Sequence, residues 1–139
     1  MITNATANSI LNAFFGRSNQ ITLAPTCYIG LSTSTPTAAG DNFTEPSEAS
    51  GYSKVLIGNY NQSSTLLMEQ ASGGSISNTN NIIFFPEATA NWGTITHFGI
   101  FTSKISSIPI MWGALTTPIT VPSGYIPIFR AGALTVSLQ

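Results

Sequence analysis

Cys27 and His97 are the only thiol and the only imidazole of the chain, and they could support two kinds of chemistry. A histidine can activate a cysteine as a nucleophile, but Cys27 lies in no nucleophile motif, and the sequence does not show whether the two side chains meet. A transition-metal site needs three or four ligands, more than these two donors supply. We expect Cys27 to be a buried thiol and His97 a hydrogen-bonded core or interface residue; a metal shared by three copies of His97 is the alternative.

Acidic side chains could hydrolyse glycosides as a pair, and the chain has five of them: Asp41, Glu45, Glu48, Glu69 and Glu87. All five lie in polar or proline-flanked segments that we predict to be loops, which hold no two of them at the separation that catalysis needs. The sequence has no Gly-x-Ser-x-Gly motif, and Gly73-Gly74 is followed by neither a lysine nor a helix. We therefore predict that the protein is not an enzyme and uses no cofactor or metal.

Residues 92–101, which include His97, form the most strand-like stretch of the chain, because β-branched and aromatic residues dominate it. Its apolar side chains occur at both even-numbered and odd-numbered positions, which point to opposite faces of a strand. We therefore expect other parts of the structure to cover both faces. Gly93 and Gly99 leave room for a bulge or a bend, which is typical of a curved sheet. The expected core residues of this central strand are Trp92, Ile95, Phe98, Ile100 and Phe101.

Further short strands are predicted at residues 21–32, 52–58, 82–85, 106–115, 125–129 and 133–138, separated by turn residues. In the last of these, Leu134, Val136 and Leu138 should point inward. A chain of 139 residues has the size of one domain. The sequence therefore predicts a mainly β protein, a single antiparallel β-sandwich of the jelly-roll kind over residues 1–139 with a short N-terminal helix.

The N-terminal helix is predicted within residues 1–17, because four apolar residues recur there at helical spacing: Ala7, Ile10, Leu11 and Phe14. Thr3 or Asn4 can cap its start, and Gly16 can end it. A helix of about twelve residues is marginal by itself in water, so its apolar face should dock on its own domain or on a neighbouring subunit. Ile10, Leu11 and Phe14 are thus candidate inter-subunit contacts.

Residues 32–51 are rich in Ser, Thr, Pro and Gly, and we predict that they form an extended loop or arm. A loop of this length in a compact domain is usually functional or ordered by a partner. We interpret it as a contact arm, with Phe43 and Glu45 as candidate inter-subunit contacts. The alternative is a solvated loop whose acidic residues only keep it in water.

Charged residues make up 6% of the chain, and the net charge is −1, which suits a protein packed in an assembly. The four basic residues are scattered singly, so nucleic acid is not an expected partner. We find no signal-peptide pattern and no run of about 18 apolar residues, so we expect no membrane association.

A series of short motifs runs along nearly the whole chain: Tyr28-Ile-Gly-Leu-Ser-Thr-Ser-Thr-Pro36, Thr44-Glu-Pro-Ser, Gly51-Tyr52, residues 92–101, Trp112-Gly-Ala-Leu-Thr-Thr-Pro and residues 129–138. Following a short helix in this order, they resemble a family of small structural proteins of tailed bacteriophages. Thr102-Ser103 stands where that family often has an acidic residue, and Ser53-Lys54 where it often has Ala-Arg. We expect loop and surface chemistry to differ there.

The resemblance implies a virion protein, assembled in the host cytoplasm, although members of the family are described variously as tail fibre, minor structural or capsid-associated proteins. Our main interpretation is a capsid decoration (cement) protein, a homotrimer on the capsid exterior that binds the major capsid protein and stabilises the shell. The low charge and the segment 32–51 suit this role. So does the lack of a fibrous shaft or trimeric coiled coil, which receptor fibres commonly need for reach.

The alternative interpretation is a tail-fibre or tail-tip protein that takes part in host-surface recognition. Its partners would be other tail proteins or host-surface glycans, on which exposed aromatic side chains can stack. The candidates for such stacking are Trp92, Trp112, Tyr60 and Tyr125. We expect the two tryptophans, which lie in apolar strands, to belong to the core instead.

Overall fold

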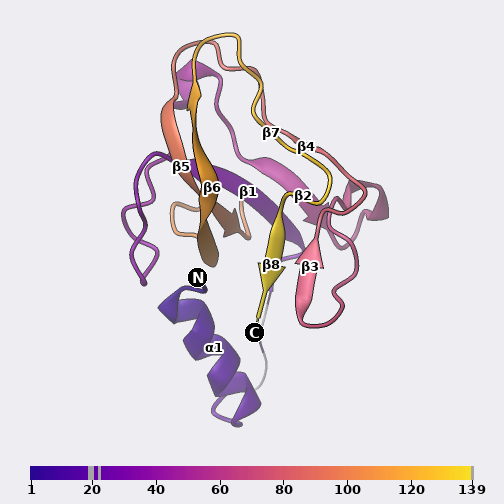
Figure 1. The fold of residues 1–139 in the computed structure, drawn as a ribbon. Coiled ribbons are helices and arrows are strands. Elements are labelled where there is room, and N and C mark those ends of the chain that lie inside the picture. The colour runs from indigo at the N-terminus through magenta and orange to yellow at the C-terminus, as the bar shows by residue number, and fades with distance from the viewer. Residues whose placement is uncertain (19–20, 22, 139) are drawn as a thin grey trace.

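The computed structural model describes residues 1–18, 21 and 23–138, and within them it is mainly β with a single α-helix near the N-terminus (Figure 1). Helix α1 covers Asn4–Phe14, within the predicted residues 1–17, and it ends there because Phe15 leaves helical geometry and Gly16 has φ +68°. The strands are β1 (Thr26–Ser32), β2 (Val55–Asn59), β3 (Ser75–Ser77), β4 (Ile83–Phe84), β5 (Gly93–Phe101), β6 (Met111–Val121), β7 (Ile128–Phe129) and β8 (Thr135–Ser137), and two short 3-10 turns lie at Glu48–Ser50 and Ser63–Thr65.

The main sheet has four antiparallel strands in the order β2-β1-β5-β6, so β5 is a central strand as predicted. Two separate antiparallel ladders, β3-β8 and β4-β7, contribute to the rest of the β structure. A mainly antiparallel β fold with an N-terminal helix is therefore confirmed, but the jelly-roll-like sandwich is not. The second layer of a sandwich would need one continuous sheet, and the prolines around these short strands limit their ladders.

Strand β6 differs most from its prediction, because it begins at Met111 rather than near Ser106 and continues to Val121. Residues 102–110 connect β5 to β6, and Pro109 is buried within this connection. Pro118 lies inside β6, where an edge strand with a bulge tolerates the missing N–H. At the C-terminus, Leu138 is 68% exposed instead of pointing inward, since β8 ends at Ser137.

The central strand is covered on both faces. On one face, Ile100 joins a buried core with residues of β1, β2 and β4, and Ile95 belongs to the same core. Just before β5, Trp92 packs edge-to-face on Tyr52 at 5.3 Å, and the Tyr52 hydroxyl lies beside Gly30 and Phe101. On the other face, Phe101 meets the ring of Phe43 at 5.2 Å. Of the five residues expected in the core of this strand, Trp92, Ile95, Ile100 and Phe101 are at most 5% exposed, and Phe98 is half-buried.

Residues 32–51 lie against the sheet in the single chain, where the sequence predicted an extended arm. Thr33 and Thr44 are joined by a backbone hydrogen bond of 2.9 Å, and Pro36 and Pro46 are both buried. The indole N–H of Trp112 donates to the carbonyl of Thr37 at 3.0 Å. Backbone and side-chain bonds of this kind order the segment without a partner.

Candidate assembly site

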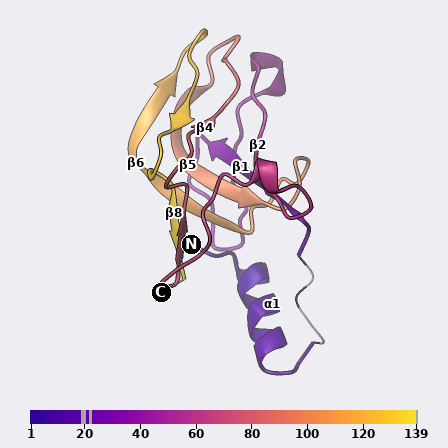
Figure 2. The same cartoon turned by 90° about the vertical axis from the view of Figure 1, so that its right-hand side faces the viewer.

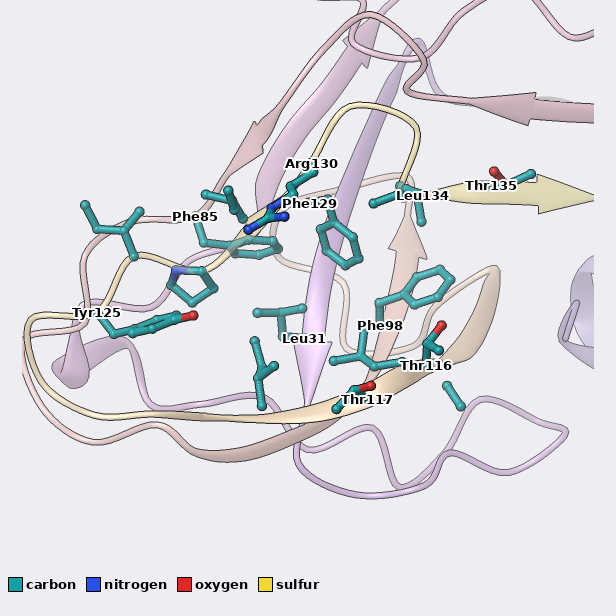
Figure 3. Close-up of a pocket in the computed structure, with 17 residues that line it drawn as sticks. Leu31, Phe85, Phe98, Thr116, Thr117, Tyr125, Phe129, Arg130, Leu134 and Thr135 are labelled. Atoms are coloured by element: carbon teal, nitrogen blue, oxygen red, sulfur yellow. The ribbon is translucent and has the colours of Figure 1, made fainter.

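A large hollow opens beside the main sheet, with a volume of about 1090 Å³ (Figure 3). Its floor is formed by Leu31 of β1 and Phe98 of β5, together with Phe129 and Leu134 of the C-terminal segment. One wall is formed by residues 114–117 and Ile119 of β6, and the other by residues 125–128 with Arg130, Ala133 and Thr135. We call this hollow the C-terminal groove.

The wall on the β6 side exists because β6 bulges away from β5. Ile95 pairs with Ile119, but two residues later His97 pairs with Ala114. Between these two pairs, the single residue Thr96 of β5 lies opposite four residues of β6, which are residues 115–118. Since proline has no N–H to donate to a ladder, Thr-Thr-Pro is a natural place for such a bulge.

The opposite wall is held by Asn78, a fully buried side chain that the sequence analysis did not single out. Its Nδ2 donates to the carbonyl of Arg130 at 2.9 Å and to that of Asn81 at 2.8 Å, and its Oδ1 accepts the N–H of Leu134 at 2.9 Å. The N–H of Gly132 also donates to the Asn78 carbonyl at 3.0 Å. The polar run in which Asn78 lies contains no local signal that would distinguish it from its exposed neighbours.

Most of the residues that line the groove are apolar, and threonines contribute polar atoms to it. The ring of Phe129 lies 6.1 Å from that of Phe98 and 6.2 Å from that of Phe85. Ile126 and Ile128 are 48% and 41% exposed at its wall. Among the described residues that line the groove, Arg130 is the one that carries a charge. A surface of this kind fits an apolar, uncharged partner.

A second hollow of about 560 Å³ shares Phe98, Ala114 and Thr135 with the first. It continues along β6 and β8 toward Met1, Ile2 and Leu138. The two hollows thus extend along the same face of the sheet.

Helix α1 is the second unusual surface, because none of its residues is buried. Leu11 is 53% exposed and Phe14 80%, and Phe15 just after the helix is 78% exposed; Ile10 is half-buried. Figures 1 and 2 show the helix projecting from the β structure. Of the two predicted docking modes of its apolar face, docking on its own domain is thus not observed.

The start of α1, in contrast, is firmly attached. Thr3 is 1% exposed, and both its N–H and its hydroxyl donate to the carbonyl of Ile110 at 3.0 Å. The N–H of Asn4 donates to the carbonyl of Ala38 at 3.0 Å. The helix is therefore anchored at its first turn, while its apolar side chains remain open.

The other two candidate contact residues, Phe43 and Glu45, have partners inside the chain. Glu45 accepts hydrogen bonds from Tyr52 at 2.6 Å and from Lys54 at 2.7 Å, and the Lys54 ammonium lies 4.3 Å from the centre of the Phe101 ring. Burial, followed by the charge of Glu45, raises the pKa of the Tyr52 hydroxyl. This cluster holds the segment 32–51 on the sheet, so an inter-subunit role of these two residues stays a prediction.

The model of one protein family, described as Podophage GP4 fiber I protein gp80, matches residues 1–137. The chain belongs to this family. The match confirms the resemblance to structural proteins of the phage virion, and it covers both the C-terminal groove and helix α1. No curated protein matches the chain.

In this member of the gp80 family, Cys27 and His97 do not form a dyad. His97 pairs with Ser32 across β1 and β5, and Cys27 lies five residues before Ser32, about 16 Å along the strand. Burial raises the pKa of the Cys27 thiol to about 11 and lowers the pKa of His97, whose Nδ1 lies 2.8 Å from the Thr96 hydroxyl. The surroundings of both residues are therefore those of structural side chains, and the two do not act on each other.

Within the described parts of the gp80-family chain, no three His, Cys, Asp or Glu side chains are grouped so as to hold a metal ion. Among the same residues, no helix has the length and apolar character needed to cross a membrane.

The four aromatic candidates for sugar contacts differ in exposure. Trp92 is 4% exposed, and its indole N–H donates to the carbonyl of Ser50 at 2.8 Å, while Trp112 is half-buried. Tyr60 is 88% exposed and Tyr125, at the wall of the groove, 46%. Of these four candidates, the two tyrosines are therefore the ones whose rings have an accessible face.

Proposed function

We propose that this protein is a structural subunit of a phage tail fibre. The observation that carries the proposal is the match of the gp80 fibre family to residues 1–137, nearly the whole chain. The protein's low charge and its exposed apolar helix support a role inside an assembly rather than as a free monomer.

This proposal replaces capsid decoration, the main interpretation from the sequence, with its alternative. The absence of a shaft or coiled coil favoured decoration, but a fibre can be built from several different chains, and one of them can be a short domain. The family description names a fibre and gives no specific support to a cement protein. Contact with the major capsid protein is accordingly not part of the proposal.

The expected partners are further copies of the same chain, as a homotrimer, and other tail proteins. Closed cyclic symmetry is the usual outcome for homo-oligomers, and threefold symmetry is one of its common forms. Host-surface glycans are a further candidate partner, for which Tyr60 provides an open ring between the polar residues Asn59 and Asn61. Loss of glycan or cell binding by a Tyr60→Ala protein, with its stability unchanged, would support that contact.

Two measurements on purified particles test the proposal. Quantitative mass spectrometry should give a small copy number per particle, and antibody-gold labelling should decorate the fibres in electron micrographs. Hundreds of copies, with label distributed over the capsid, would instead support the decoration protein and overturn the fibre assignment.

A further inference from the structure

We infer that helix α1 of one subunit docks in the C-terminal groove of a second copy, and that this contact repeats around a closed ring of subunits. The inference names the assembly contact of the proposed fibre subunit and rests on that function for its biological place. The contact itself can be tested with the isolated protein in solution.

The first support is that each chain presents both halves of the contact and covers neither. Leu11, Phe14 and Phe15 offer an apolar surface on or next to a helix without any charged residue. The groove offers Ile126 and Ile128 at its wall and Phe98 and Phe129 at its floor. Apolar side chains left open side by side in this way are what interaction sites present.

The second support is size. A helix of 11 residues is about 16 Å long and 10 to 12 Å wide with its side chains, which corresponds to a cylinder of about 1300 to 1900 Å³. The groove, at about 1090 Å³, can receive one face of such a helix but not the whole of it. The polar face, with Ser9 and Asn12, would remain in water, as in other helix-in-groove complexes.

The helix cannot fill the groove of its own chain. Thr3 and Asn4 fix its first turn to Ile110 and Ala38, and from there it projects outward (Figure 2). A neighbouring copy is therefore the occupant, and the contact is of the head-to-tail kind, in which each subunit gives a helix and receives one.

A β-strand is a less suitable occupant of this face. The free edge of β6 contains the bulge with Pro118, which disfavours strand addition. The start of β6 is already covered, since the N–H of Trp112 donates to the carbonyl of Met1 at 2.8 Å and Ile2 bridges to Met111.

The contact area favours a closed ring over an open pair. Aromatic side chains bury about 150 to 250 Å² each, so two rings about 80% exposed, with Leu11, bring on the order of 400 Å² to the groove. Both partners together then bury about 800 Å², below the roughly 1,200 Å² of stable pairs. In a closed ring every subunit makes the contact twice, and head-to-tail contacts close when the rotation allows it.

The helix side is tested by sedimentation over a concentration series. The unaltered protein should form one closed oligomer, expected to be a trimer. Phe14→Asp should raise the dissociation constant about tenfold or more, as expected for loss of an aromatic anchor. Asn12→Asp is the matched control, because it adds the same charge near the same helix end on the polar face, and it should leave the oligomer unchanged.

The groove side needs its own pair of variants. Ile126→Asp should weaken the oligomer as Phe14→Asp does, whereas Ile105→Asp, at a residue that is 93% exposed and lines neither hollow, should not. Circular dichroism and urea midpoints establish that each variant is folded. A chain with both Phe14→Cys and Ile126→Cys should form intermolecular disulfides that neither single variant forms. The single variants also control for Cys27, which is half-buried and whose pKa is raised by burial.

The outcomes separate this inference from the proposed function. A monomer at every concentration, or an oligomer that resists both Phe14→Asp and Ile126→Asp, overturns the helix-in-groove contact but leaves the fibre location to be decided on particles. Loss of the oligomer in both test variants and in neither control, together with the paired disulfide, establishes the contact even if the label were found on the capsid.

Discussion

The ring of Phe43 lies so close to Gly99 that a Cβ atom on this glycine would stand 2.6 Å from Phe43 Cε2. Gly99 pairs with Gly30 across β1 and β5, where a Cβ would stand 3.0 Å from Glu45 Oε1. The two glycines thus form a shallow site on the sheet into which the segment 32–51 fits. Only residues without a side chain allow this approach.

Gly99→Ala should destabilise the protein by about 1 to 3 kcal/mol, the usual range for overpacking, because Phe43 and the neighbouring Phe101 must shift. Gly58→Ala is the control, since its Cβ would be in ordinary contact, 3.4 Å from Leu66, in a strand of the same sheet. Urea unfolding midpoints measure both. A midpoint unchanged by Gly99→Ala would mean that the segment is not packed on the sheet in solution.

The sequence predicted the central strand correctly because the pattern lies within a few consecutive residues. β-Branched and aromatic residues at both even and odd positions favour an extended chain that is covered on both sides. The C-terminal groove has no such signal. It depends on a bulge next to Pro118 and on Asn78 joining residues 52 or more positions away in sequence, as in its bonds to Arg130 and Leu134. Periodicity cannot indicate contacts of that range.

The helix shows a different limit of sequence reasoning. The apolar spacing of Ile10, Leu11 and Phe14 predicted both a helix and an apolar face that needs a partner. Whether that partner is the same chain depends on how the first turn is anchored, and this is set by Thr3 and the carbonyl of Ile110. No pattern within residues 1–17 contains that information.

Asn78→Ala should cost about 2 to 5 kcal/mol, because it leaves the buried N–H of Leu134 and the partly buried carbonyl of Arg130 without their side-chain partner. Asn80→Ala, which removes only an exposed hydrogen bond to Glu69, should change stability by less than about 0.5 kcal/mol. Thermal or urea unfolding measures the difference. Equal effects of the two substitutions would show that Asn78 does not hold the groove wall.

Acidification should destabilise the protein through His97. Burial lowers the pKa of this side chain below its ordinary value of 6.5, so the unfolded state binds more protons than the folded state as the pH falls through 6.5. The free energy of unfolding should therefore drop between pH 7.5 and pH 5, and it should drop less in His97→Gln. Urea midpoints at the two pH values test this, and an equal drop in both proteins would show that His97 is as easily protonated in the folded state as in the unfolded one.

Phe98 and Phe101 lie three residues apart in β5 and should respond differently to replacement by alanine. Phe101 is 0% exposed beneath Phe43 and Lys54, so Phe101→Ala should cost about 3 to 5 kcal/mol of folding free energy. Phe98 is half-buried at the floor of the C-terminal groove, so Phe98→Ala should cost less than about 3 kcal/mol in the monomer.

If a neighbouring helix covers the groove, Phe98→Ala should also weaken the oligomer, whereas Phe101→Ala should act on stability alone. Urea unfolding at low protein concentration and sedimentation at high concentration separate the two effects; a Phe98→Ala protein that assembles like the unaltered chain would show that this part of the floor lies outside the contact.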